Sequence, residues 1–278
     1  MLNNKKMNLD EIQKLSNKIR IKILELALKS DGPSHLGGGL SMVDFFSVLY
    51  GSILNHDPLN PNWEHRDRFI LSKGHGVLPY FVALYFSNYI TEEELFTYKK
   101  NESHLISHPV MNLEFGIESS NGSLGHGLSM AVGIAIASKK KARSNKVFVV
   151  LGDGECNEGS IWEAAMSAAH FKLDNLVAVL DYNKLQSDGF SENVMDIGNL
   201  SQKWESFGWD TISVDGHNIS EIYSAFNKEH NSYKPKILIA NTIKGKGISF
   251  MENNNAWHHN RLTQNFYDLA ILELQKSI

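Results

Sequence analysis

The sequence predicts an α/β fold in which a doubly wound, mainly parallel sheet is flanked by helices. Three observations support this fold class. Short apolar runs without polar alternation recur in the second half of the chain, as expected for strands that helices cover on both faces. The segment "GSIWEAAMSAAHF" lies between two of these runs and has the length of a crossover helix. Because no repeat or Pro- or Ser-rich linker interrupts the sequence, we expect one domain over residues 1–278.

Helices are predicted where apolar residues recur every three to four positions. The first such segment begins at Leu9 and ends before Gly32 and Pro33. Ser41 is a candidate N-cap of the second, and Thr91 begins a capping-box pattern. The predicted helices span residues 9–28, 41–54, 77–89, 91–100, 127–143 and 159–171.

Four strands are predicted from the apolar runs. In open parallel sheets, ligands bind beyond the carboxyl ends of the strands. The loops of interest are therefore "GDGECNEG", "DYNKLQSDG", "VDGHN" and "TIKGKGISF". The predicted strands span residues 146–151, 175–181, 210–216 and 236–242.

Composition excludes several functional classes. The chain has 278 residues, 42% apolar and 21% charged residues, which is ordinary for a globular protein. Its net charge of −4 offers no basic footprint for nucleic acid. Its apolar runs are too short for a membrane helix of roughly 20 residues. The charged N-terminus and the single cysteine, Cys156, favour a cytoplasmic protein without disulfides, in which this thiol is a packing residue.

A metal and diphosphate site is predicted at two neighbouring strand ends. Gly152, Asp153 and Gly154 follow a predicted strand and precede a helix, where glycine permits a tight turn and the helix start favours an anion. Asn183 follows the next strand, and the backbone turns sharply toward Leu185. Because Mg²⁺ prefers oxygen ligands from carboxylates, amides and phosphates, these residues could hold Mg²⁺ against a diphosphate. A surface turn is the alternative for an isolated "GDG".

The complete pattern is more specific. The segment "GDGECNEGSIWEAAMSAAHFKLDNLVAVLDYNKLQSDG" resembles the transketolase family over its full length, and the resemblance extends over essentially the whole chain. It implies a thiamine diphosphate-binding fold of the diphosphate type. The implied cofactors are thiamine diphosphate and Mg²⁺, or Ca²⁺ or Mn²⁺ in its place. Asp153, Asn183 and Leu185 would hold the metal, and Glu155 would join the cofactor site.

Sequence context singles out four of the twelve histidines, which are assigned to loops rather than to helix faces. Imidazoles there could bond sugar hydroxyls and move protons near neutral pH, although a structural role as polar loop caps is the alternative. The resemblance implies that His75 and His108 hold the donor sugar. It places His35 and His258 near the diphosphate and the acceptor, and His75 and His258 also against the cofactor. His258 is chosen over His259 because it directly follows the aromatic residue.

Two further segments carry predicted cofactor contacts. "NGSLGHG" resembles the family loop whose backbone meets the aminopyrimidine ring, which implicates Gly122, Ser123 and Leu124. His126 stands where transketolases usually carry glutamine, so hydrogen bonding in this loop departs from the family pattern. Lys244 in "TIKGKG" is a candidate diphosphate cation; solvated lysines are the alternative for it and its neighbour in this loop.

The resemblance also implies a partner. In transketolases the activating glutamate, the pyrimidine pocket and the phosphate-binding arginines belong to a second domain, which would lie beyond residue 278. The chain therefore resembles the N-terminal, diphosphate-binding subunit of a split transketolase. Its expected partner is a C-terminal subunit, in a heterodimer or α2β2 assembly, and Glu158 would contact the activating glutamate across the interface.

The expected function is transfer of a two-carbon ketol unit from a ketose phosphate donor to an aldose acceptor. The alpha subunit of a 2-oxo acid dehydrogenase or decarboxylase would explain the "GDG" and Asn183 equally well, but not the four histidine loops. A non-catalytic cofactor-binding subunit is the third possibility. The sequence leaves the sugar open, and sulfonated, deoxy or nucleotide-linked sugars remain candidates.

Overall fold

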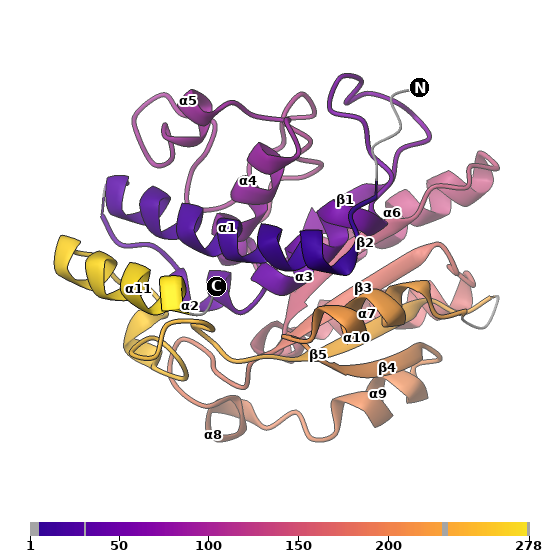
Figure 1. Ribbon diagram of the computed structural model, residues 1–278. Helices are drawn as coiled ribbons and strands as arrows, with labels where there is room; N and C mark the ends of the chain where they lie inside the picture. The colour runs from indigo at the N-terminus through magenta and orange to yellow at the C-terminus, as the bar shows by residue number, and fades with distance from the viewer. Residues whose placement is uncertain (1–5, 31, 230–232, 277–278) are drawn as a thin grey trace.

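The computed structural model describes residues 6–30, 32–229 and 233–276. One parallel sheet with the strand order β1-β2-β3-β5-β4 crosses the molecule, and helices cover both of its faces (Figure 1). The predicted doubly wound α/β fold is therefore confirmed. The strands are β1 (Arg68–Leu71), β2 (Val147–Gly152), β3 (Leu176–Tyr182), β4 (Asp210–Asp215) and β5 (Lys236–Asn241).

Alternate residues of the inner strands pack into two separate apolar clusters. In β2, Phe148 and Val150 face one apolar cluster, whereas Val149 and Leu151 face the other. Residues of the helices α1 (Leu9–Lys29), α3 (Val43–Val48), α4 (Val77–Phe86) and α10 (Ile219–Asn227) complete the first cluster. Residues of α6 (Gly127–Lys140), α7 (Gly159–His170) and α9 (Leu200–Ser206) complete the second. This two-sided burial explains why the strands read as continuous apolar runs.

Most predicted helices have counterparts in α1, α4, α5, α6 and α7, with their ends displaced by a few residues. The capping box at Thr91 and Glu94 is confirmed, but its helix, α5, ends at Leu95. The helices are α1 (Leu9–Lys29), α2 (Leu36–Leu40), α3 (Val43–Val48), α4 (Val77–Phe86), α5 (Glu92–Leu95), α6 (Gly127–Lys140), α7 (Gly159–His170), α8 (Ser191–Met195), α9 (Leu200–Ser206), α10 (Ile219–Asn227) and α11 (Gln264–Lys276).

The predicted helix over residues 41–54 is confirmed over 43–53, but its start and its regularity differ from the prediction. The chain instead forms α2, then α3, and then a π-helical turn, Leu49–Ile53. Ser41 caps no helix N-terminus. Its hydroxyl donates to the Gly38 carbonyl, 3.1 Å away, and to the Asp181 carboxylate, 2.7 Å away. The local sequence indicated a helix cap, but the Ser41 hydroxyl instead donates to a buried carboxylate.

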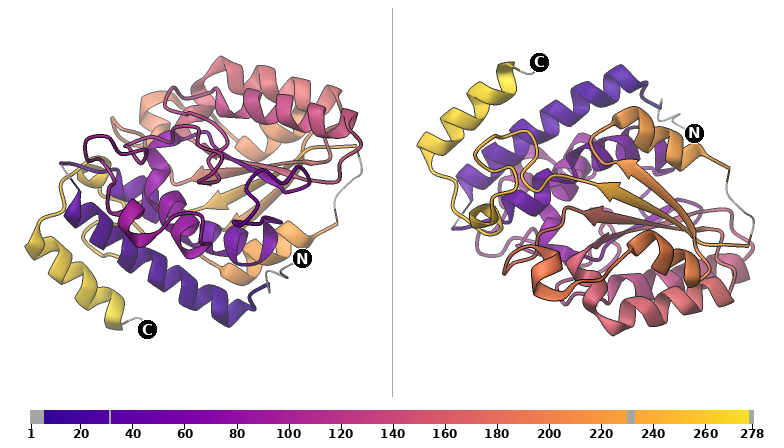
Figure 2. Two further views of the ribbon diagram at one scale, coloured as in Figure 1. Left: turned by 90° about the horizontal axis from the view of Figure 1, so that it is seen from above. Right: turned by 90° about the horizontal axis from the view of Figure 1, so that it is seen from below.

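Two helix pairs lie at opposite sides of the molecule. The views in Figure 2 place α1 beside α11 on one side and α6 beside α7 on the other. Within the described ranges, none of these helices combines the length and apolar character that crossing a bilayer requires.

We predict that Gly245→Ala destabilises the protein. Gly245 has φ +82°, and an added Cβ would lie 2.2 Å from the Met251 carbonyl oxygen. Urea denaturation should show a free energy of unfolding lowered by more than ~1 kcal/mol. Gly133→Ala, inside α6 with nothing within 4 Å of its added Cβ, is the matched control. It should raise stability by roughly 0.5–1 kcal/mol, and equal effects of the two substitutions would contradict the prediction.

Candidate active site at the carboxyl end of the sheet

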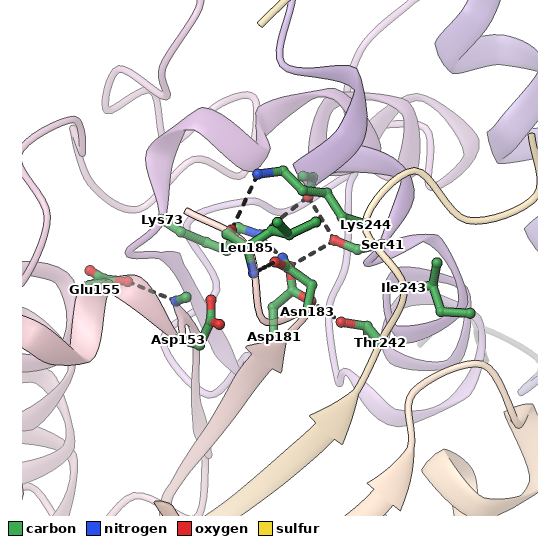
Figure 3. Close-up of polar contacts among 12 residues, drawn as sticks. Ser41, Lys73, Asp153, Glu155, Asp181, Asn183, Leu185, Thr242, Ile243 and Lys244 are labelled. Carbon is green, nitrogen blue, oxygen red and sulfur yellow. Dashed lines mark hydrogen bonds and ion pairs between the residues drawn. The ribbon is translucent and has the colours of Figure 1, made fainter. Parts of the chain in front are cut away.

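The ends of three strands lie level with one another. Gly152 of β2 pairs with Asp181 of β3, which in turn pairs with Ala240 of β5. The residues that follow therefore emerge side by side. Figure 3 shows Asp153 and Asn183 projecting from neighbouring strand ends, as the sequence predicts.

Asp153 is almost fully buried at the end of β2, with 4% exposure. Its carboxylate accepts a hydrogen bond from the Ser191 hydroxyl at 2.8 Å. Burial raises the pKa of Asp153, and the nearby Asp181 charge acts in the same direction, whereas the Ser191 hydrogen bond opposes them. A cation beside this carboxylate would stabilise its charged form.

The turn after β3 is held by its own side chain. Asn183 Oδ1 accepts from the backbone N–H of Leu185 at 3.0 Å, and Lys184 between them adopts φ +64°. The amide nitrogen of Asn183 donates to Asp181 at 2.9 Å. This arrangement fixes the Leu185 carbonyl, which accepts from Lys244 Nζ at 3.2 Å.

Asp181 is the centre of a buried network that the sequence reasoning missed. Its carboxylate has no exposure and accepts from Ser41, Lys73, Thr242 and Asn183 (Figure 3). Burial alone would raise its pKa, but the Lys73 ammonium and the donated hydrogen bonds hold that pKa below its usual range. The one feature of the sequence that points to Asp181 is that it is a single charged residue at the end of an otherwise apolar run.

Lys244 extends into the same region. Its ammonium contacts the carbonyls of Leu185 and Gln186 at 3.2 and 3.1 Å and His258 Nδ1 at 2.7 Å. Burial, followed by the charge of Lys73, lowers the pKa of Lys244 to about 8. An anion bound here would raise the pKa of Lys244 and so favour its charged ammonium form.

The four predicted histidines converge. The ring centroid of His35 lies 5.5 Å from that of His75, 6.0 Å from His108 and 5.5 Å from His258. Burial, followed by neighbouring imidazoles, lowers the pKa of His35 to about 3. Burial and Lys244 lower that of His258 to about 4. The exposed ring of His259 is tilted by 32° against that of His35, with the two centroids 4.4 Å apart.

The histidines and the strand ends share one cavity of about 380 Å³. Neither Ser123 nor His259 is among the described residues that line it, and Lys246 instead pairs with Glu252 at 3.3 Å. The geometry is thus compatible with the choice of His258, which stays a prediction. The predicted site residues that line the cavity are His35, His75, His108, Gly122, Leu124, Gly152, Asp153, Gly154, Glu155, Glu158, Asn183, Leu185, Lys244 and His258.

Glu155 supports the site rather than offering a free carboxylate. Its oxygens accept from the Ser72 hydroxyl and from the backbone N–H groups of Gly125 and Gly152, the latter two at 2.9 and 3.0 Å. A carboxylate facing a diphosphate would repel it, whereas here it joins the 122–127 loop to the end of β2. Glu158, by contrast, is exposed at the N-terminus of α7.

The available donors suit a hard cation. Among the residues that the structure describes, no group of three or more His, Cys, Asp or Glu side chains is placed to hold a metal. The candidate set is instead one carboxylate, one amide and one carbonyl, from Asp153, Asn183 and Leu185. Oxygen donors of this kind fit Mg²⁺ or Ca²⁺ when phosphate oxygens and water complete the shell, and the Lys244 ammonium would offset phosphate charge.

Two residues singled out in the sequence lie outside this chemistry. His126 is exposed at the N-cap of α6 and makes no capping hydrogen bond through its side chain. Cys156 is fully buried in the core on the α6 and α7 side, and burial raises the pKa of its thiol well above the usual range. A thiolate nucleophile is disfavoured there.

Comparison with known proteins decides the family. Residues 12–270 match the family model described as "Transketolase, thiamine diphosphate binding domain". The chain belongs to the transketolase family. This match also identifies the domain as one that binds thiamine diphosphate, in agreement with the sequence prediction.

Similar transketolase subunits have nearly the same length. The chain is 42% identical over 269 residues to one subunit of the apulose-4-phosphate transketolase of Actinobacillus succinogenes, covering 97% of this chain and 98% of that protein. It is also 42% identical to a 6-deoxy-6-sulfo-D-fructose transketolase subunit of Clostridium sp., covering 96% and 97%. A solved transketolase from Leishmania mexicana superposes with a TM-score of 0.90 at 26% identity. There the chain spans only 41% of the other protein, with 95% of its own length matched.

We predict that Lys73→Met destabilises the protein strongly. The substitution leaves the fully buried Asp181 carboxylate without its cation, which should cost about 3–5 kcal/mol in urea unfolding. The double variant Lys73→Met/Asp181→Asn should recover part of that loss, because no unpaired charge remains. A loss below ~1 kcal/mol in the single variant, or a double variant less stable than the single one, would refute this account.

Proposed function

We propose that this protein is the diphosphate-binding subunit of a two-subunit transketolase. With thiamine diphosphate and Mg²⁺, the assembled enzyme transfers a two-carbon ketol unit from a ketose or ketose phosphate to an aldose. The observation that carries this proposal is the single cavity in which oxygen donors, two buried lysines and four histidines meet. The printed substrates of its similar subunits, a sugar phosphate and a sulfonated sugar, support a sugar substrate of this class.

The strand ends would hold the cofactor's charged end. Asp153, Asn183 and the Leu185 carbonyl would bind Mg²⁺, while Lys73 and Lys244 would lie beside the diphosphate. When bound, thiamine diphosphate supplies the carbon nucleophile that the side chains of this chain lack. The chain's own residues bind and orient it.

The histidines would handle the sugar. Their lowered pKa values leave His35 and His258 neutral at physiological pH, so each ring can donate through one nitrogen and accept through the other. Because the Lys244 ammonium is a donor, His258 Nδ1 is the acceptor, and the proton is on Nε2 of a ring that lines the cavity. Together with His75 and His108, these rings would bond hydroxyls and transfer protons at the reacting end of the sugar.

The α6 and α7 side is the proposed docking face for the companion subunit. Met166 and Phe171 are 58% and 52% exposed there, and Gly133 on the adjacent α6 has open space around it. Glu158 is the N-cap of α7 and lines the cavity, so a subunit covering this face would also close the site. That similar proteins are named subunits supports a companion chain, and an α2β2 assembly in the cytoplasm stays a prediction.

The central test is cofactor binding. With the companion subunit present, calorimetry should show Mg²⁺-dependent binding of thiamine diphosphate, and Asp153→Ala should weaken it about a hundredfold or more by removing the only charged metal ligand proposed. Asp210→Ala, at the opposite end of the sheet where β4 begins, is the control and should bind normally. Wild-type binding without magnesium dependence would overturn the proposal.

The partner requirement gives a separate prediction. Met166→Glu should weaken association with the companion chain about tenfold or more, because it places a charge in an apolar interface. Leu272→Glu is a matched control, since Leu272 is 55% exposed on α11 at the other side of the molecule. Association can be measured by analytical ultracentrifugation. Ketol transfer by the purified chain alone would contradict the need for a partner.

A further inference from the structure

A histidine in the loop after β4 connects a buried ion pair to the candidate site. His217 Nδ1 lies 3.0 Å from Asp44 Oδ2 on α3, and the backbone N–H of Ile243 donates to His217 Nε2 at 2.8 Å. Ile243 follows β5 and adjoins Lys244. One imidazole thus bridges a helix of the first core and the segment that enters the cavity.

The two contacts define the protonation of the ring. A backbone N–H can only donate, so Nε2 must be the unprotonated acceptor. The proton therefore sits on Nδ1 and is donated to Asp44. A doubly protonated ring would lose the bond to Ile243.

The Asp44 carboxylate, which accepts from His217, is held in place and kept charged. Asp44 is buried, and its carboxylate also accepts from Arg20 Nη2 and the Ser16 hydroxyl, both at 2.6 Å. Although burial would raise its pKa, the Arg20 guanidinium and these hydrogen bonds hold the pKa of Asp44 well below its usual range. A fixed carboxylate of this kind orients the ring that bonds to it.

The segment around Ile243, which His217 binds, makes two contacts in the candidate site. Before Ile243, the Thr242 hydroxyl donates to Asp181. After it, the Lys244 ammonium reaches the Leu185 carbonyl and His258. Holding the Ile243 N–H therefore restrains a short segment at its midpoint, between two side chains that point into the site.

We propose that His217 is a positioning residue whose neutral ring, oriented by Asp44, holds the backbone at Ile243 so that Lys244 stays in the cavity. The effect of this positioning on cofactor affinity rests on the proposed function. The hydrogen-bond geometry at Ile243 is independent of that function.

Two substitutions separate the two hydrogen bonds. In His217→Gln the longer side chain can place its carbonyl oxygen near Nε2 and still accept from Ile243, whereas in His217→Asn the shorter amide can donate to Asp44 but cannot reach Ile243. With Mg²⁺ and the companion subunit present, we expect the Kd for thiamine diphosphate to rise about tenfold in the Asn variant and less than about threefold in the Gln variant. The turnover number at saturating cofactor should change little in either. An Asn variant that binds like wild type, or a Gln variant as weak as Asn, would overturn the proposal.

Two measurements on the chain without cofactor keep this test distinct from that of the function. The ring ¹⁵N shifts of wild-type His217 should report the Nδ1–H tautomer, and amide exchange at Ile243 should accelerate in the Asn variant but stay close to wild type in the Gln variant. The other tautomer, or equal exchange in both variants, refutes the positioning role even if wild type binds thiamine diphosphate. If the Nδ1–H tautomer and the difference in amide exchange are observed but wild type binds no cofactor, the proposed function fails and the positioning role of His217 stands.

Discussion

The carboxylate of Asp181 joins parts of the chain that lie far apart in sequence. Ser41 after α2, Lys73 after β1 and Thr242 after β5 all donate to it, and none of its surface meets solvent. A buried charge is tolerated only when its partners are complete. The loops around the cavity are consequently fixed relative to one another by one group, before any ligand contributes.

This fixed arrangement accounts for the electrostatic character of the cavity. Lys73 is neutralised by Asp181, while Lys244 makes its polar contacts with carbonyls and His258. Among the described residues, no carboxylate bonds to Lys244, and burial together with its charge lowers the pKa of the neighbouring His258. Lys244 and the proposed metal ligands lie at the strand ends, and neutral donors and acceptors lie toward the other histidines. The two halves suit an anionic group and a polyhydroxylated one, respectively.

The sequence predicted the parts of this molecule that repeat a local pattern. Strands β2, β3 and β5 were predicted from two-sided burial, and the strand-end and histidine loops from their motifs. β4 was predicted in the same way, although as an edge strand it is only partly buried. β1 was missed because "RFIL" is only four residues long and follows a charged segment. The Asp181 network was missed for another reason: Ser41, Lys73 and Thr242 become neighbours only through the order of the strands, and the hydroxyl of Ser41 locally resembles a helix cap. Likewise, nothing near Glu155 in sequence indicates that its carboxylate accepts from Ser72 and Gly125.

Cys156 has a practical consequence. It is the only cysteine in the chain, and its fully buried thiol is held protonated. Maleimide reagents react with exposed thiolates, so the native protein provides almost no labelling background. A cysteine introduced at an exposed position would then carry a fluorophore or spin label at one defined place, which would make this chain a convenient reporter for watching its assembly with other chains in real time.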